Sequence, residues 1–178
     1  WTAPRLGAKS LLKKEDVVMD YEQLFSGQET DFSSPNRTEV ENIWPDDVSR
    51  GLQALAQKML DDPPPSPRCF ALSGWGFSNT REDPTSCVST PTTDYLSWYL
   101  MAEEEAHIPL NREWMDEAVS MLRPITRGHY INETDPVHYP EHIEECFSPK
   151  SWKRLAELRK KYDPNGLFCT WLGQGEEA

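Results

Sequence analysis

The residues from Ser148 to Phe168 constrain the fold most, because they predict an amphipathic helix with a marked start and a marked stop. Ser148 is a favourable N-cap, and the proline that follows suits the first helical turn. Apolar side chains then recur at spacings of three and four and form one stripe: Trp152, Leu155, Leu158 and Tyr162. Residues 163–166 read Asp-Pro-Asn-Gly and end the helix, because proline cannot continue the hydrogen-bond ladder and Asn-Gly favours a turn. The two apolar residues after this turn are expected to pack back onto an apolar surface.

Two more helices are predicted upstream. Pro45 opens the first helix, which should end before Pro63 and carries apolar side chains on one face: Val48, Leu52, Leu55, Ala56 and Met59. Asn111 is expected to cap the second, which should stop at Pro124 and has its own apolar face: Trp114, Met115, Ala118, Met121 and Leu122. Both patterns predict helices that bury one side.

Three strands are predicted, at residues 69–75, 94–102 and 127–133. The first follows a proline-rich entry and is expected to be buried. Residues 94–102 fit both a strand and a helix; as a strand, they place Leu96, Trp98 and Leu100 on one side and Tyr95, Ser97, Tyr99 and Met101 on the other. Aromatic enrichment favours the strand. Other segments are expected to be a short strand or helical turn near 16–25, a loop at 79–91 and a connecting segment at 134–147.

The predicted helices and strands follow one another along the chain without regular alternation. This predicts one α+β domain over residues 1–178, with an antiparallel sheet and helices packed mainly on one face. A formal net charge of −12 argues against nucleic acid and anionic membranes as primary partners. The four cysteines have no zinc-motif spacing, and together with glycosylation sequons at Asn36 and Asn132 they are compatible with secretion. The sequence does not identify the cellular compartment of the protein.

The closing helix resembles a known family. A helix with Trp152 and Leu155 that runs into Tyr-Asp-Pro-Asn at 162–165 and then Leu-Phe is similar to the C-terminal segment of the berberine-bridge-enzyme-like, FAD-linked oxidases. The family's Tyr-x-Asn motif is matched by Tyr130 and Asn132. Residues 63–76 look like the family's proline-rich loop and following strand, and residues 1–12 resemble weakly the start of its substrate domain. The most family-like part is about residues 148–172.

The resemblance implies that FAD and substrate are bound by two different parts of the complete protein. Family members carry a large FAD-binding domain with a Gly-rich phosphate-binding turn, whereas the nine glycines of this chain are scattered. The chain is therefore expected to be the substrate-binding half, to bind no cofactor alone, and to work with FAD only if a flavin-binding chain supplies it. A second copy of this chain, in a homodimer, is the alternative protein partner. The expected substrate is a small organic molecule, of the kind found in secondary metabolism.

Site residues follow from the resemblance and from side-chain chemistry. The family's motif implies that Tyr130 and Asn132 lie near flavin and substrate, and a phenol beside an amide suits acid–base work. The expected catalytic residues are Tyr130, His129 and Tyr99, and the expected substrate-binding residues are Asn132, Trp75, Tyr95, Ser97 and Met101. Ordinary sheet packing is the alternative for all of them.

No metal site is expected. His138 and His142 are four residues apart with acidic neighbours, but Pro140 between them argues against a continuous helix. These two histidines and His107 are expected to be solvated loop residues, and the Glu103–Glu105 run is expected to be exposed.

Two functions stay open from the sequence. One is half of an FAD-linked oxidoreductase; the other is a flavin-free isomerase, lyase or cyclase that uses the tyrosines and His129 as proton donors and acceptors. A non-catalytic binding module ranks third.

Overall fold

The computed structural model describes residues 20–23, 37–66, 68–75, 87, 91 and 94–168, without the side chain of Trp75. Contacts divide the chain into two compact units, Trp1–Pro35 and Asn36–Ala178. The fold described below is that of the second unit. Residues 21–23 are helical, but the rest of the prediction at 16–25 and most of the loop predicted at 79–91 lie outside the described residues. The prediction of a single domain stays a prediction.

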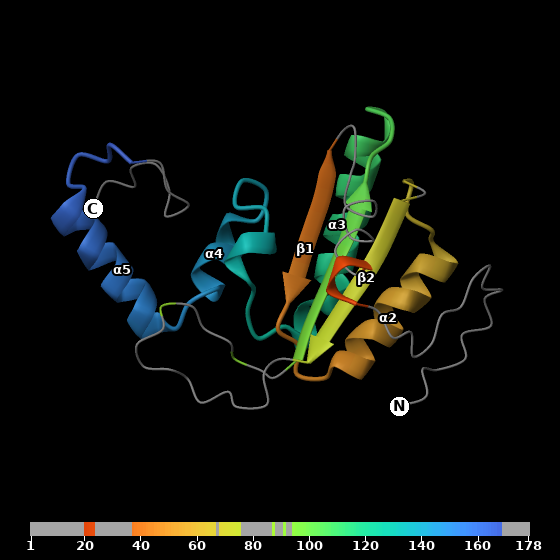
Figure 1. The fold of residues 1–178 in the computed structure, drawn as a ribbon, viewed down its shortest axis with the longest axis horizontal. Helices are drawn as coiled ribbons and strands as arrows, with labels where there is room; N and C mark the ends of the chain where they lie inside the picture. The colour runs from red at the N-terminus through yellow and green to blue at the C-terminus, as the bar shows by residue number, and fades with distance from the viewer. Residues whose placement is uncertain are drawn as a thin grey trace. The chain divides into compact units, whose positions relative to one another are not determined.

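A three-stranded antiparallel sheet forms the centre of the unit (Figure 1). Its strands are β1 (Thr38–Ile43), β2 (Arg68–Trp75) and β3 (Asp94–Met101), in the order β1-β3-β2. The register places Val40 of β1 and Phe70 of β2 on either side of Tyr99. The central strand is therefore β3, which settles the ambiguity of residues 94–102 in favour of the strand and confirms the α+β class.

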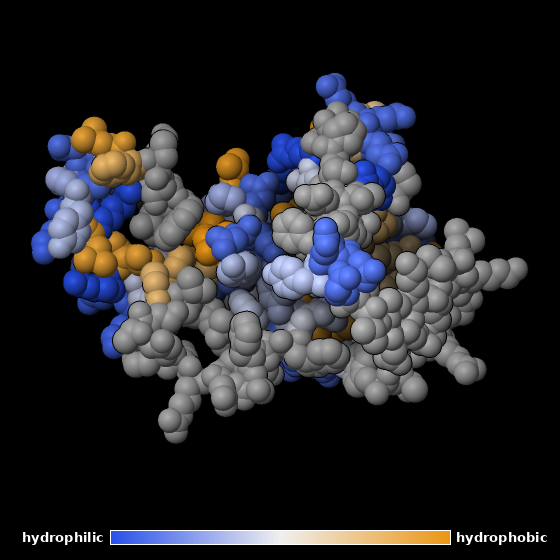
Figure 2. Space-filling view, in the orientation of Figure 1, coloured by the Kyte–Doolittle hydropathy of each residue, from blue (hydrophilic) through white to orange (hydrophobic). Residues whose placement is uncertain are grey.

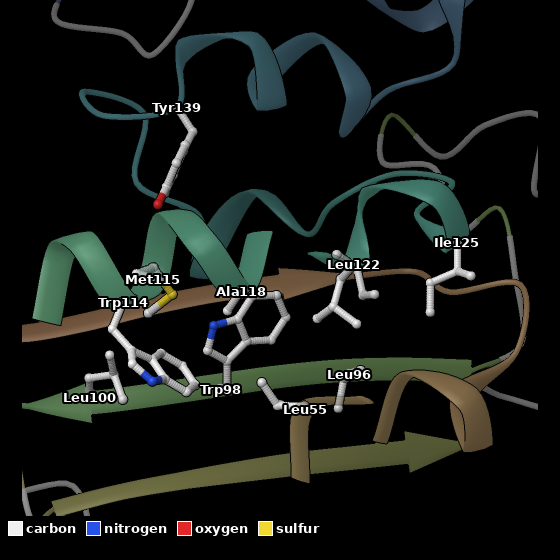
Figure 3. Packing of buried hydrophobic residues seen from close by; sticks show 11 residues of the cluster. Leu55, Leu96, Trp98, Leu100, Trp114, Met115, Ala118, Leu122, Ile125 and Tyr139 are labelled. Atoms are coloured by element: carbon white, nitrogen blue, oxygen red, sulfur yellow. The ribbon is translucent and has the colours of Figure 1, made fainter. Parts of the chain in front are cut away.

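Helices cover one face of this sheet. They are α2 (Val48–Asp61) and α3 (His107–Leu122), and the side chains of Leu96, Trp98 and Leu100 point from β3 into the core beneath them (Figure 3). All three β3 residues are 0% exposed, as the strand pattern predicted. The other members of this core come mainly from the two helices: Leu55, Trp114, Met115, Ala118 and Leu122.

Local chemistry explains the ends of two helices. The side chain of Asp47 accepts a hydrogen bond from the backbone N of Arg50 at the start of α2. Ser148 caps α5 (Pro149–Tyr162) in the same way, through the backbone N of Ser151. The predicted bounds of both helices are confirmed. None of the described helices combines the length and apolarity needed to span a membrane.

Several predictions of burial and capping are wrong. The strand β2 is a sheet edge, with Leu72 45% exposed, and is not buried. Asn111 does not cap α3, which begins four residues earlier at His107; its buried amide instead accepts a hydrogen bond from the backbone N of Ser66. Met121 is 38% exposed because it lies at the flank of the apolar face of α3.

The predicted strand at 127–133 is also absent. Backbone bonds join Arg127 and Gly128 to Trp44, and then residues 131–133 turn into the short 3₁₀ helix η2 (Ile131–Glu133). A second one, η1 (Arg123–Ile125), follows α3. Asn42 explains the turn, because its side chain binds both backbone polar groups of Tyr130 and so replaces the bonds of a continuing ladder.

The connecting segment at 134–147 contains a helix that was not predicted. Pro140 occupies the first position of α4 (Pro140–Glu145), where proline is well tolerated, and so it starts a helix instead of preventing one. A small apolar cluster of Ile143, Cys146 and Phe147 joins this helix to Trp152 and Leu155 of α5. The cysteines Cys69, Cys87 and Cys146 are free.

The end of α5 is exposed. Tyr162 is 68%, Leu167 79% and Phe168 70% exposed, so the expectation that the chain packs back onto an apolar surface is wrong within the described residues. Figure 2 shows orange apolar residues beside blue hydrophilic ones over this helix.

Candidate functional site

The face of β3 turned away from α2 and α3 carries Tyr95, Ser97 and Tyr99. Side chains alternate along a strand, so these three residues share the side opposite the helix-covered core. Tyr99 is 7% exposed, and its ring stacks on Phe70 of β2 with centroids 4.6 Å apart. Tyr95 packs against Trp44 at 4.9 Å. The sequence prediction that these residues share a face is confirmed.

Two other predicted binding residues are not brought to the same place. Met101 shares the face but lies six residues along β3 from Tyr95, which corresponds to about 20 Å in a strand. It is 1% exposed, and on the same face Ser97 is equally buried at 0%. Trp75 belongs to β2 and pairs with Asp94, but its side chain lies outside the described part of the structure.

The turn that follows Gly128 brings a second group of residues to Tyr95. The rings of Tyr95 and Tyr130 meet edge to face, with centroids 6.2 Å apart. The amide of Asn132 donates to the Tyr130 hydroxyl over 2.6 Å, so phenol and amide are joined, although they lie in a 3₁₀ turn and not in a strand. We call the combined surface the tyrosine face; its members are Tyr95, Ser97, Tyr99, Tyr130, Asn132 and Glu133.

Glu133 is the charged group of the tyrosine face. The hydroxyl of Tyr95 donates to its carboxylate. Burial, and then the Glu133 carboxylate, raise the pKa of Tyr95 well above its ordinary value. The same two causes raise the pKa of Tyr99 to about 12, while the hydroxyl of Ser97 opposes the shift. Both phenols therefore stay protonated at neutral pH, with the Glu133 carboxylate beside them.

Asn42 of β1 positions the turn. Its amide nitrogen donates to the carbonyl oxygen of Tyr130 over 3.0 Å, and its amide oxygen accepts from the backbone N of Tyr130 over 2.6 Å. Asn42 is 0% exposed, so both bonds are formed away from solvent. The amide thus fixes the start of η2 against the sheet.

His129 points into the interior and not toward the tyrosine face. It is 1% exposed, its Nδ1 lies 2.7 Å from the carbonyl oxygen of Asn42, and its ring stacks on His142 at 3.8 Å. The structure therefore separates His129 from Tyr130 and Tyr99, with which it was grouped as a catalytic residue.

The prediction of solvated loop histidines is right for only one of three residues, since His107 begins α3 and is half-buried. His138 is exposed and contacts Asp116 over 2.7 Å. His142 is 2% exposed and contacts the carboxylate of Glu41 over 3.2 Å, because α4 turns it inward. The run Glu103–Glu105 is exposed as expected.

Two acidic residues of importance were missed. Glu133 directly follows the Tyr-x-Asn motif, and this adjacency could have suggested it. Glu41 gave no such signal, because in the sequence it is an acidic residue between Val40 and Asn42 in a mixed strand, and only the tertiary fold brings it to the histidines.

Gly128 sets the close approach between the turn and α4. A Cβ atom at this position would lie 2.8 Å from the backbone oxygen of Glu145. The Gly128→Ala variant is therefore expected to lose about 1–3 kcal/mol of unfolding free energy through overpacking, measured by urea denaturation.

Gly74 provides the matched control. A Cβ atom there meets nothing within 4 Å, so Gly74→Ala should leave stability unchanged or raise it by up to about 1 kcal/mol. Equal stability of the two variants would contradict the close packing at Gly128.

Comparison with known proteins shows which family this sequence is similar to. Residues 129–173 match the family described as berberine and berberine like. The FAD-linked oxidoreductase YvdP of Bacillus subtilis, named as uncharacterized, is 22% identical over 117 residues, which is 65% of this chain and 26% of that protein. The FAD-linked oxidoreductase ffsJ of Aspergillus flavipes is 39% identical over 62 residues, 35% of this chain and 10% of that protein. The FAD-linked oxidoreductase easE of Aspergillus fumigatus is 33% identical over 91 residues, 51% of this chain and 13% of that protein.

The matched part covers one half of the tyrosine face, and Tyr95, Ser97 and Tyr99 lie outside it. Tyr130, Asn132 and Glu133 all lie inside residues 129–173, as do α4 and α5. The matches span between about a tenth and a quarter of the length of these relatives. The chain is thus similar to the berberine-bridge-enzyme-like, FAD-linked oxidoreductases, and residues 129–173 are the part that matches the family's model.

Proposed function

We propose that this chain supplies the substrate-facing part of an FAD-linked oxidoreductase that oxidises a small organic molecule, with FAD held by sequence outside it. The observation that carries the proposal is the convergence of Tyr95, Tyr130 and Glu133 within and beside the family-matching segment. The names of the relatives support FAD as the cofactor of the complete system.

The side chains of the tyrosine face are of the types that contact a flavin and its substrate. Stacked and edge-on aromatic rings with a hydroxyl or amide at their margins suit a flat conjugated molecule. Dinucleotide phosphates call for a Gly-rich turn at a helix start, and in this sequence the glycines are scattered. The described residues thus fit the reacting end of the cofactor and not its phosphate end.

This chain's own residues would transfer the proton that the substrate loses. FAD, when bound, accepts the hydride that an oxidised alcohol or amine loses. The proton lost from the same substrate can pass to Tyr95 while the Tyr95 proton moves to the carboxylate of Glu133, so that the charge on Glu133 is neutralised. Tyr99, with its raised pKa, stays protonated and can donate to a substrate oxygen.

The second candidate is a flavin-free isomerase, lyase or cyclase. It is favoured by the completeness of the acid–base set, since phenol donors and a carboxylate acceptor are all present in one chain. This reading requires no cofactor, and His129 takes no part in it because the histidine is buried elsewhere.

Flavin binding and turnover separate these candidates. The purified chain is expected to be colourless and to leave the fluorescence of equimolar FAD unquenched. Oxygen consumption with a panel of small aromatic alcohols and amines is expected only when a flavin-binding chain is added. In that mixture Glu133→Gln should lower turnover by about 10²–10⁴-fold, since it removes the proton acceptor.

Glu113→Gln on the exposed surface of α3 is the matched control and should leave turnover unchanged. A yellow preparation with a flavin spectrum would contradict the proposal. Conversion of a substrate by the chain alone, without oxygen consumption, would establish the second candidate instead.

A further inference from the structure

A carboxylate and two imidazoles meet in the interior, away from the tyrosine face. Glu41 comes from β1, His129 from the segment before η2, and His142 from α4. They are 0%, 1% and 2% exposed, and one potential ligand atom from each lies within 4.8 Å of the other two. The Nδ1 atoms of His129 and His142 lie 3.5 Å and 3.2 Å from the two Glu41 oxygens.

The buried carboxylate needs a positive partner. Glu41 accepts hydrogen bonds from the backbone N of Asn42 and the hydroxyl of Thr134, both over 2.9 Å. These donors are neutral, and among the described residues the two imidazoles are its only ion-pair partners. A buried carboxylate is retained at low cost only when a cation balances it. Either an imidazolium or a metal ion can be that cation.

The number and type of ligand atoms favour the metal. One imidazolium would balance the charge, yet two imidazoles converge, and two protonated rings would repel each other across the 3.8 Å stack. Two imidazole nitrogens and a carboxylate are a ligand set of zinc and related divalent ions. Sequence spacing does not reveal this set, because Glu41 and His129 are far apart in the chain.

A second carboxylate lies close to the ring nitrogen of His129 that points away from Glu41. The Nε2 atom of His129 is buried without a hydrogen-bond partner, and Oε2 of Glu145 lies 3.6 Å from it. Metal-bound histidines commonly donate their other N–H to a carboxylate. Arg123 holds Glu145 in place by donating from its two terminal guanidinium nitrogens to the two carboxylate oxygens, over 2.5 and 2.6 Å.

We propose that Glu41, His129 and His142 bind one divalent ion of the zinc class through a Glu41 oxygen and one nitrogen of each imidazole. Binding through Nδ1 of His129 requires this atom to give up its contact with the carbonyl oxygen of Asn42, and it requires the stacked rings, now 11° apart, to turn until their lone pairs converge. The ion joins β1, the Gly128–Tyr130 segment and α4, and so stabilises the support of the tyrosine face. The site does not depend on the redox function.

Metal titration of the whole chain tests this site. After treatment with a chelator, the chain is expected to bind one Zn²⁺ by calorimetry and one Co²⁺ with a visible absorption band, with a rise in Tm. His142→Asn and Glu41→Gln should weaken Zn²⁺ binding at least about 100-fold. Loss of a residue that only hydrogen-bonds to a metal ligand costs about 10–100-fold in affinity, and loss of the ligand itself should cost more. His138→Asn removes an exposed histidine and should bind like the wild type.

Either of two binding results would overturn the site: wild-type affinity in His142→Asn, or no Zn²⁺ bound by the wild-type chain at equimolar concentration. The second would identify an imidazolium as the cation. If the variants unfold, ¹⁵N spectra of the wild type decide the matter, since one equivalent of Zn²⁺ should shift His129 and His142 and leave His107 and His138 in place. Shifts at His138 instead would also refute the assignment.

Discussion

Replacement of Leu55 by alanine is expected to cost about 2–5 kcal/mol of unfolding free energy. Leu55 is 1% exposed and projects from α2 toward Leu96 and Trp98 of β3 (Figure 3). The lost methyl groups leave a cavity bounded by a strand and a large indole, which cannot collapse fully. A domain of this size has about 5–15 kcal/mol of stability in total, so the loss should be plain in urea denaturation followed by circular dichroism.

Leu60 supplies a control in the same helix. It is 44% exposed, and Leu60→Ala makes the same change of helix propensity without opening a cavity, so the effect should stay within about 0.5 kcal/mol. Equal losses in the two variants would show that α2 does not bury the face assigned to it.

Local patterns predicted much of this fold because local chemistry determines the features concerned. The start of α5 follows from the hydroxyl of Ser148, and the two faces of β3 follow from the alternation of its side chains. The end of α5 follows from residues 163–166 in the same way.

The failures occurred where a distant partner decides the outcome. Asn111 resembles a cap but is taken by the backbone of Ser66, which is 45 residues away. Residues 127–133 have strand character, yet the side chain of Asn42 binds Tyr130 and turns the chain. Both are hydrogen bonds of a buried amide, which no local period encodes.

The same distinction applies to the candidate site. The shared face of Tyr95, Ser97 and Tyr99 and the pairing of Tyr130 with Asn132 were predictable. The proximity of Glu133 to Tyr95 was not, since it depends on how η2 docks against β3. The burial of His142 depends likewise on the orientation of α4.

Glu41→Gln is expected to cost about 3–5 kcal/mol of unfolding free energy near neutral pH, with chelator present so that no metal ion contributes to the difference. Glutamine keeps the size of the side chain but brings an N–H₂ group toward the donors at Asn42, Thr134 and His142. Urea denaturation of both proteins measures the loss. Glu113→Gln on the exposed side of α3 should change stability by less than about 0.5 kcal/mol.

The pH dependence of the difference between wild type and Glu41→Gln identifies the cause. Burial opposes ionisation of Glu41, but contacts with His129 and His142 and the Asn42 amide outweigh it and hold the pKa of this carboxyl below its usual 4.5. A carboxyl whose pKa is lower in the folded state stabilises the protein above the unfolded value and loses that contribution as the pH falls through the folded value. The difference should thus shrink as the pH falls below 4.5. Asp135 and Glu145 also have lowered pKa values, but both are present in both proteins and cancel in the comparison. A difference that stays constant down to low pH would mean that the charge of Glu41 contributes nothing, and that glutamine destabilises through shape alone.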